Sequence, residues 1–483
     1  MARFQAVEAF HRLADETVLL PMSFERIEGG RAVISNFVGD FLTVTDEELR
    51  RIVELDVAPG DGLYERAYEK LLISGRSQIS RLQLIAARYR TRMAFANAGT
   101  GLHLFVVTLR CEHSCPYCQV SRRSADKNLF DMDEVTAQKA LDMAFSSPSP
   151  QIKIEFQGGE PLLNFELIKK IVFWGEERSA ELGKPVTFVI TTNLALLNDE
   201  VLQFSKEHQI LISTSLDGPK DLHNKNRPRP GGNSYELAVA GIDRIREFLG
   251  PDKVGALMTT TQSSLDRAKD IIDEYVDRDL GGIFLRPLSP YGFAIKTKQF
   301  ARYKTDEWFE FYKTGLNYIF EINKAGKHFP EFYATNILRR MFSDRPTGYV
   351  DLRSPAGIGL GALVYNYDGR VFASDEGRML AEMGDRTFDL GDVFTSSYED
   401  IILSDKLVDL VANSLTQCAP QCRTCAFEPH CGADPVYHHA TQGDEVGIKP
   451  LSEFCRRQKN MMALLLDILD NSPDEAAILR SWI

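Results

Sequence analysis

The sequence has no cysteine between Cys118 and Cys418, no long apolar run and no excess of positive charge. Without a run of about 18 apolar residues, a membrane-spanning helix is not expected. The first residues also lack the basic stretch and apolar core of a secretory signal. The formal net charge of −12 argues against general nucleic-acid binding. We therefore expect a cytoplasmic protein whose partners include no membrane and no nucleic acid.

Eight cysteines form two groups, three within residues 111–118 and five within residues 418–455. A reducing cytoplasm disfavours disulfides. Cysteines gathered in this way indicate metal sites rather than scattered structural thiols. The chain of 483 residues is too long for one average domain, so we expect two or three domains.

Residues 100–290 alternate strand and helix patterns. Six β/α units in sequence predict a parallel sheet with right-handed crossovers, and their number suits a TIM-like barrel that is incomplete relative to eight units. The fold class is therefore α/β, with a partial (β/α)6 barrel whose chemistry lies at the carboxyl ends of the strands. The strands are predicted at residues 103–108, 152–157, 186–191, 210–215, 254–259 and 282–288, and the helices at residues 137–145, 165–181, 199–206, 235–248 and 265–278.

The sequence on either side of the barrel predicts further domains. Two strand patterns are joined by Gly29 and Gly30, and a helix start follows at Thr45 with Glu48 three residues on. A hairpin followed by helices predicts a winged-helix-like N-terminal domain, and the alternative is a packing extension of the barrel. The expected domains are residues 1–95 for this unit, 96–300 for the barrel, 301–350 for a helical connector and 351–483 for a C-terminal domain ending in a helix.

Cys111, Cys115 and Cys118 form a C-x3-C-x2-C loop directly after the first predicted strand. Thiolates are the ligands of iron–sulfur clusters, and three of them on a short loop leave one iron of a [4Fe–4S] cube open. The main alternative is zinc, but structural zinc sites usually need four ligands, often in paired C-x2–4-C units. His113 lies inside the loop at an awkward spacing for a fourth ligand. The loop therefore favours an iron–sulfur cluster.

This spacing, with the aromatic Tyr117 before the last cysteine, resembles the motif of the radical S-adenosylmethionine (SAM) superfamily. Gly158-Gly159-Glu160-Pro161 follows the second strand and resembles the superfamily's GGEP motif. The resemblance implies that the open iron binds SAM, that Tyr117 packs near the adenine and that Glu160 accepts from the SAM ammonium group. The two glycines would let the backbone approach the ligand closely. Reductive cleavage of SAM would then give a 5′-deoxyadenosyl radical.

Polar residues at the ends of later strands, and in the loop after the fourth, resemble superfamily positions that contact SAM or the substrate. Hydroxyl, amide and guanidinium groups suit such contacts. The alternatives are strand-end capping for the hydroxyl and amide groups, and a solvated or ion-paired position for each arginine. These candidates are Thr192, Asn193, Ser213, Ser215, Arg227 and Arg286.

The C-terminal cysteines include Cys422-x2-Cys425-x5-Cys431, with Cys455 further on. This run resembles the SPASM domain, the auxiliary-cluster module of radical SAM peptide-modifying enzymes. The resemblance implies one auxiliary [4Fe–4S] cluster on these four cysteines. A structural zinc site of four cysteines is the alternative, because C-x2-C also suits zinc.

The sequence departs from the SPASM pattern where a second auxiliary cluster would be held. Pro435 stands at the position of a further cysteine, and the segments 354–357 and 372–374 carry none. We therefore expect one auxiliary cluster and not two. Cys418 is then spare, either as a free thiol or as an alternative ligand.

Several longer strings resemble the radical SAM maturase of the His-Xaa-Ser peptide system, namely residues 101–110, 365–370 and 431–437. This resemblance implies hydrogen abstraction from a ribosomally made precursor peptide, and a cross-link or related oxidation as the product. The implied partners are that peptide, an electron donor such as flavodoxin or ferredoxin, and a second radical SAM maturase. The winged-helix-like domain would bind the peptide by strand addition.

Two other functions stay open at this point. One is an anaerobic sulfatase-type maturase that oxidises Cys or Ser to formylglycine, although that group normally carries two auxiliary clusters. The other is a zinc-stabilised peptide-binding adaptor without catalysis. The intact Cys111–Cys118 loop and the Gly158–Pro161 motif argue against the adaptor. No side chain is nominated as the catalytic acid or base.

Overall fold

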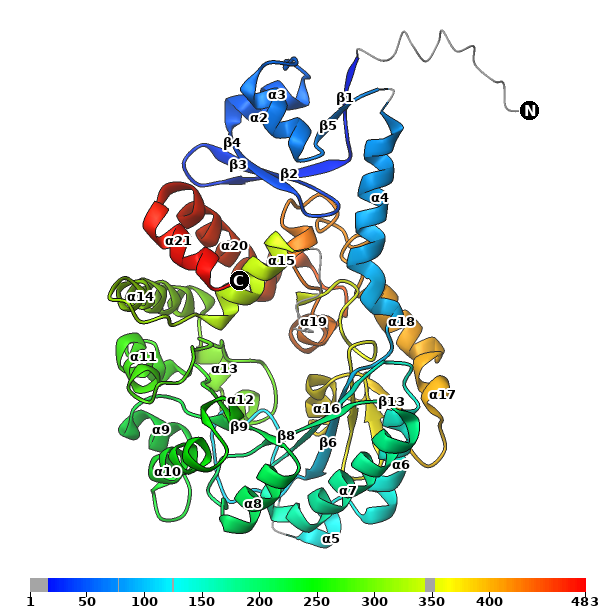
Figure 1. The fold of residues 1–483 in the computed structure, drawn as a ribbon, viewed down its shortest axis with the longest axis vertical. Helices are drawn as coiled ribbons and strands as arrows, with labels where there is room; N and C mark the ends of the chain where they lie inside the picture. The colour runs from blue at the N-terminus through cyan, green and yellow to red at the C-terminus, as the bar shows by residue number, and fades with distance from the viewer. Residues whose placement is uncertain (1–15, 77, 124–125, 344–351) are drawn as a thin grey trace, which may run out of the picture.

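The computed structural model describes residues 16–76, 78–123, 126–343 and 352–483. Figure 1 shows a small N-terminal unit at the top, the α/β barrel at the bottom, and helices from residues 305–342 and 453–481 between them. Residues 1–15, which open the first expected domain, and residues 344–351, which include the expected boundary between residues 350 and 351, lie outside the described residues.

The N-terminal unit is built on an antiparallel sheet with the order β2-β3-β4. The predicted hairpin is confirmed, with Gly29 and Gly30 at φ +78° and +67° in its turn. The predicted helix start is confirmed as a capping box between Thr45 and Glu48. The elements are β1 (Thr17–Leu19), β2 (Met22–Ile27), β3 (Arg31–Asn36), β4 (Phe41–Thr45), α2 (Asp46–Val53), α3 (Gly62–Glu69), β5 (Ile73–Gly75), α4 (Ile79–Met93) and η1 (Ala94–Asn97).

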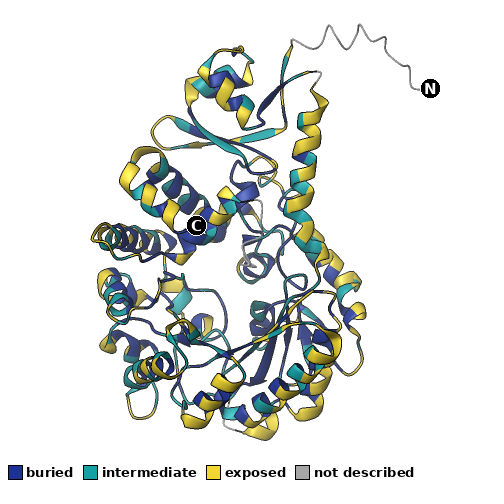
Figure 2. Cartoon of the chain, viewed as in Figure 1, coloured by how far each residue is buried: buried dark blue, intermediate teal, exposed yellow. Residues whose placement is uncertain are grey.

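Five parallel strands form the barrel sheet in the order β10-β9-β8-β7-β6. Strand β6 is buried along almost its whole length, whereas β7 and β9 alternate buried with more exposed residues; the buried stretches are dark in Figure 2. The five strands are β6 (Leu102–Thr108), β7 (Ile152–Gly158), β8 (Val186–Thr191), β9 (Leu211–Ser215) and β10 (Val254–Leu257).

The sixth predicted strand, residues 282–288, is wrong as a strand. Only Ile283 makes an isolated bridge, to Glu331. The Leu285 amide donates to the Glu331 carboxylate at 3.0 Å instead of to a neighbouring strand, and Pro287 has no amide hydrogen for a ladder. The segment still runs beside the barrel, since the Thr260 amide donates to the Arg286 carbonyl.

The helices predicted between the strands are confirmed, with small shifts at their ends. For example, the Asp133 side chain caps α6, and Gly183 ends α7 in the left-handed conformation. The helices and 3-10 turns of this region are α5 (Lys127–Phe130), α6 (Glu134–Phe145), η2 (Pro161–Asn164), α7 (Phe165–Leu182), α8 (Asp199–Glu207), α9 (Lys220–Asn226), α10 (Ser234–Phe248), η3 (Pro251–Lys253), η4 (Gln262–Ser264) and α11 (Ala268–Asp277).

The C-terminal region extends the barrel sheet instead of standing apart from it. Strand β11 (Ala362–Tyr365) pairs in parallel with β6, and the predicted hairpin continues into β12 (Arg370–Phe372) and β13 (Asp389–Asp392). The sheet therefore has eight strands. This pairing brings α16 (Asp375–Ala381), which follows β12, next to the carboxyl ends of the barrel strands.

The remaining helices join the barrel to the C-terminal region through one continuous apolar core, while the N-terminal unit has a second core within residues 32–73. No helix in the described ranges has the length and apolar character needed to cross a membrane. These helices are α12 (Phe293–Lys296), α13 (Gln299–Arg302), α14 (Thr305–Lys324), α15 (Phe332–Phe342), α17 (Tyr398–Ile402), α18 (Asp405–Asn413), η6 (Glu428–His430), α19 (Pro435–Gln442), η7 (Lys449–Leu451), α20 (Glu453–Asn471) and α21 (Pro473–Ser481).

Candidate active site

A cavity of about 420 Å³ opens at the carboxyl ends of the barrel strands. It collects the predicted site residues of the barrel except Glu160. They come from the cysteine loop, the ends of β7, β8 and β9, the end of α9 and the segment between α11 and α12. The predicted residues that line it are Cys111, Cys115, Tyr117, Cys118, Gly158, Gly159, Thr192, Asn193, Ser213, Ser215, Arg227 and Arg286.

Two glycines at the end of β7 lie against the backbone that leads into the cysteine loop. A Cβ atom on Gly158 would lie 1.9 Å from the Thr108 carbonyl oxygen, and one on Gly159 would lie 2.1 Å from that of Arg110. The Gly159 and Glu160 amides donate to these same two carbonyls. The glycines are therefore needed for the close approach of the β7 end to the cysteine loop.

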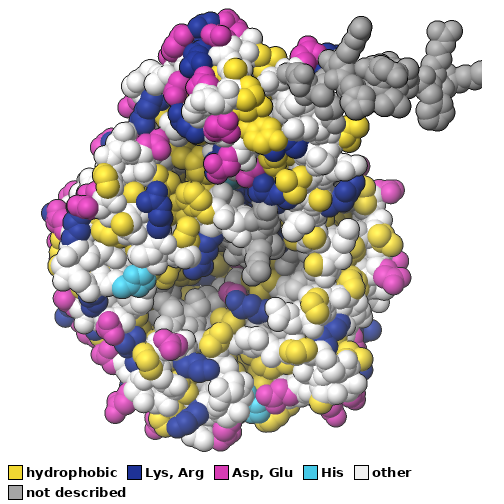
Figure 3. Space-filling view, turned by 45° about the horizontal axis from the view of Figure 1, so that its top comes forward, with side chains coloured by type: hydrophobic (Ala, Val, Ile, Leu, Met, Phe, Trp, Pro, Cys, Tyr) yellow, Lys and Arg dark blue, Asp and Glu magenta, His cyan; other side chains and the backbone are white. Residues whose placement is uncertain are grey.

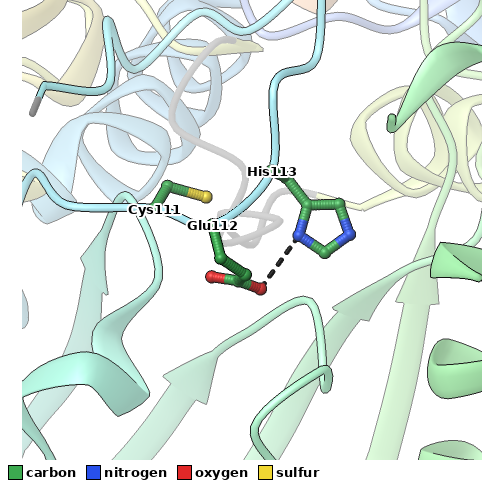
Figure 4. Close-up of side chains that lie close together, drawn as sticks. All are labelled: Cys111, Glu112 and His113. Carbon is green, nitrogen blue, oxygen red and sulfur yellow. Dashed lines mark hydrogen bonds and ion pairs between the residues drawn. The ribbon is translucent and has the colours of Figure 1, made fainter. Parts of the chain in front are cut away.

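The cysteine loop is held from several sides. Figure 4 shows Glu112 and His113 joined by a hydrogen bond, 2.9 Å between Oε1 and Nδ1. The other ring nitrogen of His113 lies 2.8 Å from the Ser234 hydroxyl. Both nitrogens of this buried ring thus have protein partners, so in this structure His113 anchors the loop.

Glu160 is the predicted site residue that does not line the cavity. It is fully buried, and its carboxylate accepts from the Leu162 amide, the Thr192 hydroxyl and the Asn193 amide at 2.6–3.0 Å. Burial, followed by the nearby Glu112 carboxylate, raises the pKa of Glu160 to about 7. In this structure Glu160 orders the loop after β8, which carries the cavity-lining Thr192 and Asn193.

A buried charge pair lies close to Cys115. The Asp217 carboxylate accepts from the Arg227 guanidinium at 3.0 and 3.2 Å and from the Tyr117 hydroxyl at 2.6 Å. Burial raises the pKa of Cys115 to about 12, and the positive charge of Arg227 opposes that rise. Arg227 therefore favours the thiolate form that an iron ligand requires.

The cavity also has a wall that the sequence did not predict. Ser374, Asp375, Glu376 and Met379 reach it from α16 and the residue before it. Ser374 caps this helix by accepting from the Gly377 amide. The Ser-Asp-Glu string predicts a helix start, but only the β11–β6 pairing places that start at the cavity.

The donor set around the cavity fits a site-differentiated [4Fe–4S] cluster. Cys111, Cys115 and Cys118 all line the same cavity, and it offers hydroxyl, amide and guanidinium groups for the polar parts of SAM. In the described part of the chain, the only group of three or more His, Cys, Asp or Glu ligand atoms within 4.8 Å of one another is Cys111, Glu112 and His113. The three thiols are therefore spread more widely than the ligands of a single ion.

The four C-terminal thiols lie close enough to influence one another. Burial, followed by the thiols of Cys455, Cys422 and Cys425, raises the pKa of Cys431. No three of the four fall within 4.8 Å of one another among the residues described, whereas tetrahedral zinc would bring its sulfurs to about 3.8 Å. Cys418 is exposed and lies near Tyr89.

Comparison with known proteins agrees with this site. Residues 105–274 match the radical SAM superfamily. A segment of 159 residues, 32% of this chain, is 38% identical to an uncharacterized protein of Methanocaldococcus jannaschii and covers 53% of it. A cysteine-type anaerobic sulfatase-maturating enzyme of Clostridium perfringens is 22% identical over 222 residues, 42% of this chain and 59% of that enzyme. The chain thus spans between half and three fifths of the length of these two relatives.

Solved structures share the fold over more of the chain. The structure of native anSMEcpe with bound AdoMet has a TM-score of 0.65 at 15% identity, and covers 79% of this chain and 99% of its own. Streptococcus suis SuiB bound to the precursor peptide SuiA has a TM-score of 0.53 at 13% identity, and covers 90% and 98%. The predicted radical SAM α/β fold is confirmed.

Residues 105–274 thus match the radical SAM superfamily, and the chain is similar in sequence to an anaerobic sulfatase-maturating enzyme and in fold to anSMEcpe and SuiB. The expected cofactors, a [4Fe–4S] cluster and SAM, are those of this superfamily.

Proposed function

We propose that this protein is a radical SAM enzyme that abstracts a hydrogen atom from a ribosomally made precursor peptide and installs a cross-link or related oxidation. The observation that carries the proposal is the cavity shared by three thiols, the Gly158–Gly159 turn and helix α16. When bound, the cluster and SAM supply a 5′-deoxyadenosyl radical. The chain itself binds, orients and shields the reactants.

The residues proposed to hold SAM are the polar groups of the cavity wall. Tyr117 would pack near the adenine, and Arg227 and Arg286 suit the carboxylate of SAM or the substrate. Asn193 is positioned by Glu160 through its amide. Glu160 keeps its proposed role toward the SAM ammonium group through its Oε2 atom, for which one protein donor is described.

We propose that residues 1–95 bind the peptide by strand addition to β4. One edge of the three-stranded sheet, β2, contacts the cysteine-rich region, where the Glu25 carboxylate pairs with Lys459 at 2.9 Å. The other edge, β4, borders a groove of about 600 Å³ between α3, α15, α20 and α21. An extended peptide could add its backbone to this edge and its side chains to the groove.

The groove favours a peptide that carries both acidic and apolar residues. Its apolar wall includes Phe41, Phe342 and Leu469. The basic residues that line the groove outnumber the two acidic ones, although several of these basic side chains already have hydrogen-bond partners within the protein. The basic residues are Arg66, Lys70, Arg88, Arg92 and Arg480. Elsewhere, Figure 3 shows basic and acidic side chains intermixed on the face in view.

The proposal is tested by anaerobic reconstitution followed by iron analysis, incubation with SAM and a reductant, and co-expression with a peptide encoded nearby. We expect about eight irons per chain for two [4Fe–4S] clusters, release of 5′-deoxyadenosine, and a peptide that has lost pairs of hydrogen atoms. A colourless protein that binds zinc would contradict the enzyme. Formylglycine in a sulfatase peptide would instead identify a sulfatase-type maturase.

A further inference from the structure

Lys449 is a cation buried in the cysteine-rich region. Only 7% of its surface is exposed. It opens η7, and the following Ser452 caps α20, the helix that carries Cys455. No carboxylate of the described residues makes an ion pair with its ammonium group. Its described contacts are with the His438 ring, at 3.3 Å from Nε2 and 3.5 Å from Nδ1.

His438 does not supply the missing negative charge. Its Nδ1 lies 2.8 Å from the Asp434 carbonyl oxygen, which can only accept, so Nδ1 carries the proton. Its Nε2 lies 2.8 Å from the Ser452 hydroxyl. Burial lowers the pKa of His438 to about 4. The ring is therefore neutral, and it can accept a hydrogen bond from Lys449 without balancing its charge.

Hydrogen bonds connect Lys449 to the cysteine region, because the His438 Nε2 atom it contacts lies 2.8 Å from the Ser452 hydroxyl, which accepts from the Cys455 amide at 3.2 Å. The groups that can balance the charge are the cysteines, with the Asp434 carboxylate as a smaller contributor. Burial lowers the pKa of Lys449, while the thiols of Cys422, Cys431 and Cys455 oppose this by raising it. A buried charge is costly unless an opposite charge lies beside it.

We propose that Lys449 is the buried counter-charge of the auxiliary cluster, and that its ammonium group raises the reduction potential of that cluster. The inference rests on the proposed auxiliary cluster. Four thiolates give such a cluster a net negative charge, which becomes more negative on reduction. A fixed positive charge in a poorly screened site stabilises the reduced state more than the oxidised state.

Lys459 provides a matched comparison within the same region. It also influences Cys425 and Cys455 electrostatically. Its side chain is 38% exposed and pairs with Glu25 at 2.9 Å. Water and the glutamate therefore screen its charge, so its removal should change the cluster potential less than the removal of Lys449.

The test uses the full chain with Cys111, Cys115 and Cys118 replaced by Ala, so that only the auxiliary cluster is loaded. Its midpoint potential is measured by redox titration with electron paramagnetic resonance, alongside iron content. We expect Lys449→Met to shift the potential to more negative values, Lys449→Arg to restore most of the shift, and Lys459→Met to have a smaller effect.

An unchanged potential in Lys449→Met with full iron content would overturn the inference and leave the auxiliary cluster standing. If Lys449→Met holds no iron, the iron content of Lys449→Arg tests the inference instead. Iron retained by Lys449→Arg supports a counter-charge role, and iron lost from both variants overturns that role. The variant that lacks Cys111, Cys115 and Cys118 but keeps Lys449 is the reference. If it holds no cluster, or holds zinc, the proposed auxiliary cluster itself is contradicted.

Discussion

The Tyr117 hydroxyl donates a hydrogen bond of 2.6 Å to the Asp217 carboxylate, which joins the cysteine loop to the end of β9. Asp217 is fully buried, and its other side-chain donor is Arg227. Tyr117 stands between Cys115 and Cys118, so this bond connects that part of the cysteine loop to the pair of Asp217 and Arg227. The geometry of the cluster loop therefore depends on a strand about 100 residues further along the chain.

Asp217→Asn should destabilise the protein strongly, because it leaves the Arg227 guanidinium buried without its anion. Breaking a buried ion pair in this way costs about 3–5 kcal/mol. Tyr117→Phe removes one hydrogen bond to a charged group and should cost about 1.5–3 kcal/mol. Melting temperatures of the anaerobic protein measure both. The control is Tyr318→Phe, which removes a partly exposed hydrogen bond to Asp273 and should lower the melting temperature less. Equal melting temperatures for Asp217→Asn and the unmodified chain would contradict the prediction.

Gly159→Ala should prevent the end of β7 from approaching the cysteine loop. Its Cβ would meet the Arg110 carbonyl oxygen at 2.1 Å, so backbone must move. Overpacking of this kind costs about 1–3 kcal/mol or more. The matched control is Gly255→Ala on β10, where a Cβ meets nothing within 4 Å. Iron content after reconstitution and melting temperature should fall in the first variant and stay unchanged in the second.

The buried Glu160 should make stability depend on pH. Its pKa is raised from 4.5 to about 7, so the folded protein retains a proton that the unfolded chain releases. Its contribution to stability is full below pH 4.5 and is lost as the pH rises to about 7. Relative to Glu160→Gln, the metal-free protein should lose at most about 1.4 kcal/mol per pH unit in this window. Urea unfolding at several pH values measures this, and parallel curves for the two proteins would refute it.

Cys431→Ala should remove the auxiliary cluster and leave the SAM-binding cluster in place. Iron content should fall from about eight to about four per chain, while 5′-deoxyadenosine is still formed from SAM. Cys418→Ala is the control, because its exposed thiol is not among the four proposed ligands. A loss of iron in Cys418→Ala equal to that in Cys431→Ala would make Cys418 a ligand.

Thr43→Pro should weaken peptide binding without stopping SAM cleavage. The Thr43 carbonyl accepts from Arg66 on α3, so its backbone faces the groove and not β3. Proline removes the amide hydrogen that an added strand would use, and edge strands tolerate it. Thr43→Val keeps that amide and serves as control. The dissociation constant for the precursor peptide should rise in the proline variant alone, and equal binding by both would argue against strand addition at β4.

Local sequence patterns predicted the local structure well. The capping box at Thr45, the turn at Gly29 and Gly30, and the helix stripe of residues 137–145 depend on neighbouring residues only. The cysteine spacing and the GGEP string likewise predicted which loops meet at the cavity, because carboxyl ends of parallel strands lie at one edge of a sheet.

Patterns that depend on distant partners were less informative. Residues 282–288 have the composition of a strand, but their amides meet Glu331, and that partner is fixed by the packing of α14 and α15. The approach of α16 to the cavity depends on β11 pairing with β6, more than 250 residues apart in the chain.

The sequence alone determined the chemistry of the donors: two cysteine groups with spacings that suit iron–sulfur clusters, and a βα repeat to carry the first. The type of each ligand and the number of residues between ligands are covalent properties of the chain, so they can be read from the sequence without knowing the fold. Only the tertiary structure decided what surrounds those donors. The buried pair of Asp217 and Arg227, the buried cation Lys449 and the edge of β4 arise from long-range packing, which sets burial and therefore the strength of every charge.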